Sequence, residues 1–279
     1  MAVIGAGAAG FMAAIAAAES GARVTLYNSH PLPGLKILMS GGTRCNVTHA
    51  VVGPESFHGG SRPAIGLVLK SFPADAVRRW FEARGVPLKE EPGGKLFPVG
   101  DSARAVVAMF EAELDRLGIR RRFGHPVTSM TRRDGVFHLD TPAGTDSARA
   151  VILTSGGLSY PKTGSDGSGY RLARGMGHAI TPTTPALTPL VLAGGALFDL
   201  QGLTLPAALT LRIDGRRRVT RAGSLLLTHF GLSGPAALDM SRHWLGAPSG
   251  ADRRIFVHWR PGPARSLADG GGLVDPPGA

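Results

Sequence analysis

Near its start the chain reads Ala-Val-Ile-Gly-Ala-Gly-Ala-Ala-Gly at residues 2–10, a short apolar run followed at once by closely spaced glycines. The apolar run predicts a β-strand, and the Ala-rich residues after it predict a helix that ends near Glu19. Gly5, Gly7 and Gly10 have the G-x-G-x-x-G spacing of a dinucleotide-binding turn. The stretch therefore predicts the start of a nucleotide-binding α/β domain.

Each glycine of this turn has a distinct physical task. Gly5 allows the sharp turn at the end of the strand, Gly7 lets a pyrophosphate approach the backbone, and Gly10 lets the helix pack closely on the strand. The start of the helix offers free N–H groups and the positive end of its dipole to phosphates. A second apolar run at residues 22–28 stands where a βαβ unit needs its next strand. A purely structural glycine turn is the alternative, and this context favours the dinucleotide site.

The composition is that of a globular protein. The 279 residues suffice for one large domain or two ordinary ones, with 43% hydrophobic and 18% charged residues. No apolar run approaches the roughly 18 residues of a membrane span. The N-terminal residues lack the basic segment of a signal peptide. The single cysteine, Cys45, excludes an internal disulfide and favours a cytoplasmic location.

The charge balance is strongly basic. Lysine and arginine number 31 against 20 acidic residues, which gives a formal net charge of +11. Such a charge raises the hypothesis of a polyanionic partner such as nucleic acid. The basic residues form only short runs, at 120–122, 132–133 and 216–218, and aromatic residues make up 6% of the chain. Without an aromatic platform beside these runs, the sequence favours a small-molecule substrate over a nucleic acid.

The end of the second predicted strand departs from the usual dinucleotide site. A ribose-binding carboxylate is expected about 20 residues after the glycines, and Asn28 stands in that place. Its amide can hydrogen-bond a ribose hydroxyl, although it carries no charge and accepts less strongly. Residues 31–50 follow, with Ser40-Gly41-Gly42 in a bend and donors at Arg44 and Asn46. An ordinary glycine loop is the alternative, but the position after a βαβ unit favours a loop that wraps a ligand.

The middle of the chain alternates helix and strand patterns. Apolar residues at helical spacing predict helical structure over residues 63–85 and a helix over 102–117, with Ser102 as its N-cap. Strands are predicted at residues 127–130, 136–140 and 150–154, with hairpin turns at Gly93-Gly94 and Asp134-Gly135.

The strand at 150–154 ends in a second glycine turn, Ser155-Gly156-Gly157. These glycines sit at the carboxyl end of a strand, where ligands bind in open α/β sheets. A short helix is predicted at residues 170–176.

The sequence pattern changes from residue 182 onward, where prolines interrupt short apolar runs that predict strands. This change predicts an all-β or barrel-like module, and residues 223–235 predict a strand, a turn and the start of a helix. The predicted organisation is a nucleotide-binding domain over 1–186, a β-rich module over 187–259 and a disordered tail over 260–279.

Four stretches together resemble a known family: residues 5–10, 36–48, 156–170 and 228–235. The most specific are Lys-Ile-Leu-Met-Ser-Gly-Gly-Thr-Arg-Cys-Asn-Val-Thr and Ser-Tyr-Pro-Lys-Thr-Gly-Ser-Asp-Gly-Ser-Gly-Tyr. The chain resembles the bacterial flavoprotein family named aminoacetone oxidase-like or bile-acid 4,6-reductase-like. The resemblance implies a glutathione-reductase-type, FAD-binding Rossmann-like α/β domain with an inserted β-rich, barrel-like module. It also implies an FAD-dependent oxidoreductase that acts on a small organic substrate, with NAD(P)H as a candidate transient co-substrate.

The resemblance also assigns residues to the cofactor. The first glycine turn would hold the FAD pyrophosphate, Asn28 would take the ribose position, and Val127 would pair its backbone with the adenine. A second set would follow the flavin side, and the turn after the strand at 150–154 would make a further contact. The full set is Gly5, Gly7, Ala9, Gly10, Asn28, Lys36, Ser40, Gly41, Gly42, Arg44, Cys45, Asn46, Val127, Thr154, Ser155, Gly156 and Gly157.

Three side chains are candidates for the chemistry itself. Arg44 would place positive charge near the flavin, and a phosphate-binding or surface arginine is the alternative. His229 and Tyr160 are candidate proton donors, with a structural role as the alternative for each. Cys45 has no second cysteine for a redox pair, which favours a small packed residue beside the cofactor. The histidines show no metal-ligand spacing, so no metal site is predicted.

The family has a late glycine-rich segment with an aspartate that returns to the FAD domain, and no such segment is found here. We therefore expect a chain that is incomplete at its C-terminus, with weak FAD binding or none. Two further functions stay open beside the oxidoreductase: a non-catalytic nucleotide- or RNA-associated protein, and an inactive fragment. Flavin colour with nicotinamide-dependent reduction would distinguish the enzyme from both.

Overall fold

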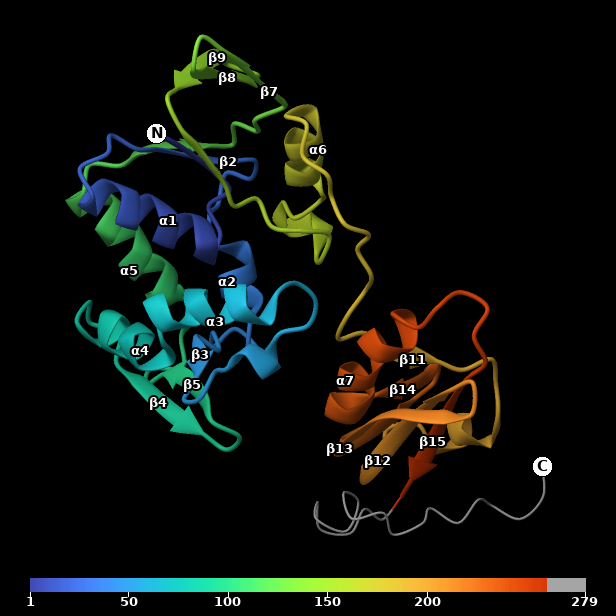
Figure 1. Ribbon diagram of the computed structural model, residues 1–279. Coiled ribbons are helices and arrows are strands. Elements are labelled where there is room, and N and C mark those ends of the chain that lie inside the picture. Colours follow the sequence, from blue (N-terminus) through green and yellow to red (C-terminus); the bar gives the residue numbers. More distant parts are fainter. Residues whose placement is uncertain (260–279) are drawn as a thin grey trace. The chain divides into compact units, whose positions relative to one another are not determined.

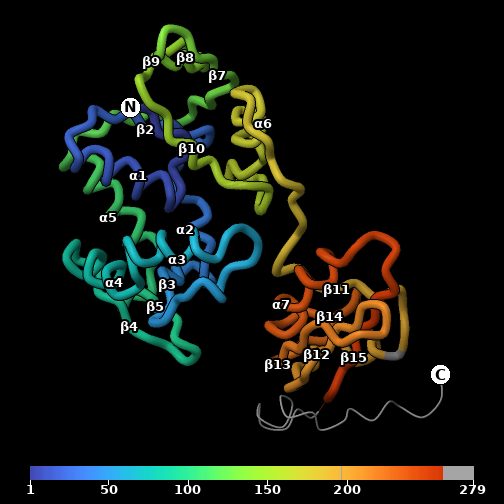
Figure 2. The backbone as a smooth tube through the Cα atoms, viewed as in Figure 1, coloured from blue at the N-terminus to red at the C-terminus, as the bar shows by residue number. Residues whose placement is uncertain are grey.

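The computed structural model describes residues 1–259. They divide into two compact units (Figure 1; Figure 2), of which the first ends at Ile180 and the second begins at Thr181. The sequence placed the boundary after residue 186, within a proline-rich stretch that contains no helix or strand up to Leu190. The tail expected at residues 260–279 lies outside the described residues.

The first unit is built on a parallel sheet with the strand order β10-β1-β2-β6. Inside it, β1 (Ala2–Ile4) pairs with β2 (Thr25–Asn28) on one side and with β10 (Val151–Leu153) on the other. β6 (Arg120–Phe123) forms the edge beside β2. The glycine turn leaves the carboxyl end of β1, as predicted. Together these features confirm the Rossmann-like fold class.

Two long helices form the core of this unit with the sheet. α1 (Ala8–Glu19) and α5 (Ala103–Arg116) lie side by side (Figure 1). The rings of Phe11 and Phe110 stack between them with centroids 4.8 Å apart. The Ser102 hydroxyl accepts a hydrogen bond from the first turn of α5, which confirms the predicted N-cap.

The helical stretch predicted over residues 63–85 is interrupted. It forms two helices, α3 (Arg62–Ser71) and α4 (Ala74–Glu82). Pro73 stands at the N-cap of α4, and Phe72 before it has an extended φ of −145°. Proline has no N–H to donate and disfavours helical geometry in the residue before it, which explains the break.

The hairpin predicted at Gly93-Gly94 is present. β4 (Leu88–Glu91) and β5 (Lys95–Pro98) pair antiparallel, and both glycines have positive φ, at 87° and 76°. A third strand, β3 (Thr48–His49), pairs with β5. Two short helices lie before and after β3, namely α2 (Leu35–Met39) and η1 (Pro54–Ser56).

A second small sheet contains β7 (Ser129–Arg133), β8 (Val136–Thr141) and β9 (Gly144–Ala148). The predicted Asp134-Gly135 turn joins the first two strands, with both residues at positive φ. β9 was not predicted, because its polar residues have no apolar alternation. After β10 come η2 (Pro161–Thr163) and α6 (Ser168–Gly175).

The second unit is an antiparallel sheet in the order β11-β14-β13-β12-β15 with one helix packed on it. Its elements are β11 (Leu190–Val191), η3 (Ala196–Leu200), β12 (Thr204–Ile213), β13 (Arg216–Thr228), β14 (Gly231–Ser233), α7 (Gly234–Leu245) and β15 (Arg253–His258). In the part of the chain that the structure describes, β11 and β15 are edges. The module is thus β-rich, as expected, and its described strands form one antiparallel sheet.

The side of this sheet under α7 carries the core of the second unit. Leu209, Leu211, Leu225 and Leu227 are buried there against the helix, whose Met240 is fully buried. Strand side chains alternate between the two faces, so the residues between these leucines point away from α7.

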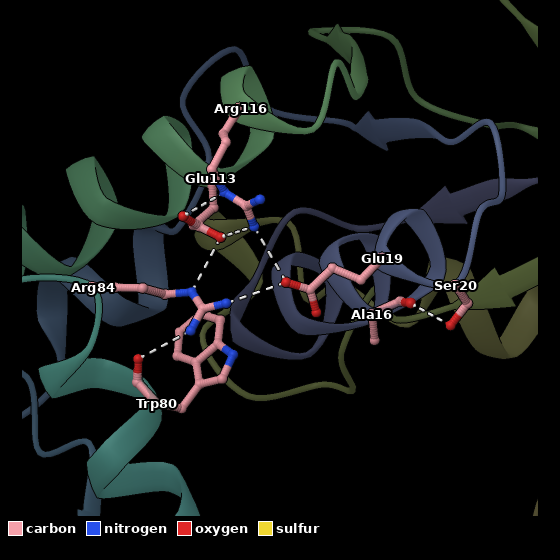
Figure 3. A network of polar contacts seen from close by, with 7 residues as sticks. All are labelled: Ala16, Glu19, Ser20, Trp80, Arg84, Glu113 and Arg116. Carbon is pink, nitrogen blue, oxygen red and sulfur yellow. Dashed lines mark hydrogen bonds and ion pairs between the residues drawn. The ribbon is translucent and has the colours of Figure 1, made fainter.

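Charged side chains join α1, α4 and α5 of the first unit at one surface (Figure 3). Arg84 lies 3.1 Å from Glu113 and 3.2 Å from Glu19. Arg116 lies 2.7 Å from the same oxygen of Glu113 and 3.2 Å from Glu19. The guanidinium of Arg84 also covers the Trp80 ring, 3.9 Å from its centroid. The network therefore fixes the three helices against one another.

We expect the Glu113→Gln variant to lose about 1–2 kcal/mol of unfolding free energy at neutral pH, because two arginines lose a charged acceptor. The hydrogen bond from Arg116, with that from Arg84, holds the pKa of the Glu113 carboxyl below its usual value. Since the folded pKa is the lower one, the stabilisation is complete above the unfolded pKa of about 4.3. It disappears as the pH falls through the folded pKa.

Urea unfolding at several pH values measures this effect. Glu111→Gln is the matched control, because this side chain lies on the same helix and has no ion pair within residues 1–259. A loss equal to that of the control, or one that stays constant down to pH 3, would contradict the expectation.

Among residues 1–259, none of the helices combines the length and the apolar character that crossing a membrane requires.

Candidate functional site

A cavity of about 460 Å³ opens in the first unit at the carboxyl ends of β1, β2 and β10. This is where ligands bind in open parallel sheets. Its wall is made by segments far apart in the sequence. These are residues 4–9, 27–29, 32, 34–36, 125–128, 154–156, 163–166, 168 and 171–172.

The first glycine turn is packed as tightly as its spacing predicts. A Cβ built on Gly10 would lie 1.7 Å from the Gly5 carbonyl oxygen, so only glycine permits this approach of helix and turn. Gly5 has a φ of 108°, and a Cβ there would lie 2.6 Å from the Ser155 backbone. A Cβ on Gly7 would meet nothing within 4 Å. Gly7 therefore leaves open space on the cavity side, as a ligand approaching the backbone requires.

The start of α1 offers unused hydrogen-bond donors to the cavity. Gly7 is the N-cap and has no side chain to cap the helix, and the first turn contains no acidic residue. Within residues 1–259 the N–H groups of Ala8 and Ala9 have no acceptor, and both residues line the cavity. Free N–H groups at the positive end of a helix dipole bind anions such as a pyrophosphate.

Asn28 connects the end of β2 to the glycine turn. Its Oδ1 accepts a hydrogen bond of 3.1 Å from the Ala6 N–H. Its Nδ2 donates to the carbonyl oxygens of His30 (2.7 Å) and Leu32 (3.2 Å). Both donors are thus used, and Oδ1 keeps one lone pair for a ligand hydroxyl. The residue lines the cavity and also holds the turn in place.

The second glycine turn interlocks with the first. The Thr154 hydroxyl donates to the carbonyl oxygens of Ile4 and Gly5, each at 3.0 Å. A Cβ on Gly156 would lie 2.3 Å from the Ser165 hydroxyl, so residues 163–166 press against this turn. The two glycine turns therefore form one rigid wall.

Cationic side chains reach the cavity from two helices. Lys36 of α2 lines it and donates to the Ser159 carbonyl at 3.2 Å. Arg171 of α6 also lines it, close to Asp166. The N–H and hydroxyl of Ser168 hydrogen-bond Asp166 and, with the charge of Arg171, hold the pKa of that carboxyl below its usual value. The wall thus carries two positive charges and one negative charge.

Tyr27 closes the cavity floor on β2. Burial, together with a hydrogen bond from its hydroxyl to Asp146 (2.8 Å), raises the pKa of Tyr27 well above its ordinary value. The phenol therefore stays neutral and joins β2 to β9.

Most of the predicted cofactor residues meet at this cavity. Those on its wall are Gly5, Gly7, Ala9, Asn28, Lys36, Val127, Thr154, Ser155 and Gly156. Gly10 lies directly behind the turn. Gly157, Ser40, Gly41, Gly42, Arg44, Cys45 and Asn46 do not line the cavity.

Arg44 is held by groups away from the cavity. It forms ion pairs with Glu91 (2.7 Å) and Asp101 (3.5 Å) and lies over the Phe97 ring at 4.2 Å. The hydrogen bond to Glu91 raises its pKa further. These contacts join the loop after α2 to the β4–β5 hairpin, a structural role that needs no ligand.

Cys45 and Asn46 lie in the same loop. Burial raises the pKa of the Cys45 thiol, which suits a packed residue rather than a reactive thiolate. Asn46 Oδ1 is buried without a hydrogen-bond partner among the described residues, so it can still accept from a bound group.

The other two candidates for chemistry are not among the residues that line the cavity. Tyr160 is 63% exposed, has a φ of 56° and is absent from the cavity wall. His229 belongs to the second unit, in the turn between β13 and β14, where its ring meets Phe230 edge to face. The structure describes each unit by itself, so it does not bring His229 to the cavity.

Several wall residues were not predicted as site residues. His125, Thr128, Ser165, Asp166 and Arg171 line the cavity. The 154–170 stretch was recognised as a ligand loop, and its serine and aspartate were available signals. His125 and Arg171 carry no local motif, because the fold alone brings their segments to the strand ends. Within residues 1–259 no group of three potential metal ligands occurs.

The sequence matches the family model described as the HI0933-like protein Rossmann domain over residues 1–272. It is 33% identical over 245 residues to the ribosomal RNA dihydrouridine synthase of Escherichia coli (strain K12), covering 87% of this chain and 60% of that protein. It is 32% identical over 262 residues to the 3-dehydro-bile acid delta(4,6)-reductase of Clostridium scindens, covering 93% and 64%.

The ribosomal RNA dihydrouridine synthase of Haemophilus influenzae is 30% identical over 248 residues, covering 87% of this chain and 61% of that protein. The chain thus spans about three fifths of the length of the curated relatives it matches. Since the family model covers nearly all of the sequence, this chain belongs to the HI0933-like family of Rossmann-domain proteins.

Proposed function

We propose that this protein is an FAD-dependent reductase that saturates a carbon–carbon double bond conjugated to a carbonyl group. The observation that carries the proposal is the cavity at the ends of β1, β2 and β10. There, Gly7 leaves open space in front of the free N–H groups of α1. A dinucleotide fits this donor set, and membership of the HI0933-like family supports FAD as that dinucleotide.

The wall residues suggest how FAD would be held. The N–H groups of Ala8 and Ala9 would take the pyrophosphate, and the free lone pair of Asn28 would accept from a ribose hydroxyl. Val127 would lie against the adenine, while Lys36 would add positive charge beside the second glycine turn. When bound, FAD supplies hydride chemistry, and the protein contributes position, charge and exclusion of water.

The names of the relatives suggest the type of reaction. Two of these names, dihydrouridine synthase and 3-dehydro-bile acid delta(4,6)-reductase, both indicate the saturation of a double bond next to a carbonyl. We propose the same chemistry for this chain: two electrons and two protons add across such a bond. We propose NAD(P)H as the electron donor. It is a reductant of the cytoplasm, and a chain with a single cysteine, which forms no internal disulfide, suits that reducing compartment.

The test begins with reconstitution of the purified protein with FAD. The sequence alone predicts weak FAD binding or none, but the free N–H groups at the cavity support retention of the cofactor. We expect flavin to stay bound through gel filtration, and NADH or NADPH to bleach its visible absorbance in the absence of oxygen. Adding a conjugated enone steroid or a uridine-containing RNA should restore the flavin colour if it is the substrate. A protein that shows no FAD binding by titration calorimetry would refute the proposal.

A further inference from the structure

The second unit carries a row of arginines across three neighbouring strands. β12 lies between β13 and β15 (Figure 1). In the strand register Arg212 is directly opposite Arg217 on one side and Arg254 on the other. Strands lie about 4.8 Å apart, so these three positions span about 10 Å. We call Arg254, Arg212 and Arg217 the arginine row.

The arginine row lies on the face of the sheet away from α7. Leu211, its neighbour in β12, is buried against the helix, and consecutive strand residues point to opposite faces. Arg217 and Arg254 are exposed, and Arg212 is half-buried with its guanidinium 5.0 Å from the Phe256 ring. Arg217 and Arg254 therefore present their positive charges to the solvent on either side of Arg212.

The adjoining hairpin adds further positive charge at 216–218. Arg216 and Arg218 are exposed, and within residues 1–259 neither they nor Arg217 has an ion pair. Among residues 1–259 two carboxylates lie at this end: Asp252 pairs with Arg254 at 3.2 Å, and Asp214 accepts from a backbone N–H. Like charges directly opposite in a sheet are destabilising, so a bound anion would relieve a repulsion built into the fold.

We infer that this face of the second unit binds the phosphate backbone of RNA. A row about 10 Å long exceeds a single phosphate group and matches a polyanion. All of its cations are arginines, whose planar fork binds phosphate bidentately. Within residues 181–259 the surface-exposed large apolar residues lie outside the segments 212–221 and 252–256, so these segments offer no anchors for insertion into a membrane.

The inference deepens the proposed function, because RNA held here would be the polymer that carries the carbonyl-conjugated bond. It reverses the expectation from composition that a nucleic acid is disfavoured as a partner. That expectation rested on short basic runs without aromatic residues. The strand register places the run at 216–218 in line with Arg254, which is far away in the sequence. Binding to the phosphate backbone of RNA needs no aromatic platform.

Binding is measured by fluorescence anisotropy with a labelled single-stranded poly(U) oligonucleotide, over a series of salt concentrations. The test variant is Arg217→Ser/Arg218→Ser/Arg254→Ser. The control variant Arg62→Ser/Arg104→Ser/Arg133→Ser removes the same charge from exposed positions of the first unit. We expect the test variant to bind at least about tenfold more weakly and the salt slope to fall by about 2, at about 0.7 per lost contact.

The control variant should bind as the unchanged protein does. Equal weakening of both variants, or no binding of poly(U) by the unchanged protein, would overturn the inference, as would binding to phosphatidylserine vesicles alone. Thermal unfolding confirms that both variants fold. Flavin absorbance is recorded in parallel: a colourless protein whose RNA binding still depends on the arginine row refutes the proposed reductase and leaves the RNA surface standing.

Discussion

The Gly10→Ala variant is expected to lose about 3 kcal/mol of unfolding free energy and, with it, the cofactor. The new Cβ would lie 1.7 Å from the Gly5 carbonyl oxygen. The helix backbone fixes the position of the Cβ, and the oxygen is itself a backbone atom, so neither can turn aside. Overpacking of this kind forces the helix and the turn apart. Since the N–H groups that face the cavity belong to the same helix, the cofactor site is distorted together with the fold. Thermal or urea unfolding measures the first effect and flavin absorbance the second.

Two other glycines provide matched comparisons. Gly100→Ala places a methyl group where no atom lies within 4 Å, so stability and flavin binding should both stay unchanged. Gly7→Ala is equally free of contacts and has an ordinary φ of −89°, so the protein should fold normally. Its methyl group would stand where we propose the pyrophosphate, and FAD affinity should fall at least about tenfold. If Gly7→Ala binds FAD as tightly as the unchanged protein, the proposed pyrophosphate position is wrong.

The Asn28→Asp variant is the second change with a large expected effect. A carboxylate can still accept from Ala6, but it cannot donate to the carbonyl oxygens of His30 and Leu32. It would place a negative charge beside two acceptors at the edge of the cavity. We expect a loss of about 2 kcal/mol in unfolding free energy at neutral pH, since the segment after β2 loses both hydrogen bonds from this side chain and its two carbonyl oxygens face a negative charge.

The pH dependence separates this explanation from a general loss of stability. The two carbonyls would raise the pKa of the new carboxyl in the folded protein above its unfolded value. The deficit should therefore be largest at neutral pH and shrink as the pH falls and the carboxyl becomes a donor. The Asn28→Ala variant loses the same hydrogen bonds without adding charge, so its deficit should not follow this titration. Identical pH profiles for the two variants would show that the carbonyl contacts are not the cause.

Much of the fold could be predicted because it depends on local signals. The spacing of Gly5, Gly7 and Gly10 predicts a tight turn. The structure has that turn, and a Cβ at Gly5 or Gly10 would clash with neighbouring backbone atoms. The break between α3 and α4 was missed because a single proline outweighed a continuous apolar pattern. β9 was missed because its pairing with β8, not its own composition, makes it a strand.

The candidate site was predictable where a motif marks it and not elsewhere. Asn28 and Gly156 stand at strand ends, which parallel pairing brings to one edge of the sheet. Arg44 carries an equally specific motif, yet it pairs with Glu91 and Asp101, whose approach depends on the β4–β5 hairpin. A motif identifies a side chain, but it does not say whether a ligand or another protein side chain will be its partner.

The sequence by itself determined the Rossmann-like turn, the order of the first strands and the β-rich character of the second unit. Each of these follows from interactions between residues close in the chain: turn geometry, helix capping and apolar periodicity. Only the tertiary structure decided that Arg171 and His125 share a cavity wall with Gly7, and that Arg212, Arg217 and Arg254 stand in one row. Strand register and helix packing set those contacts, and both depend on segments that meet only once the chain has folded.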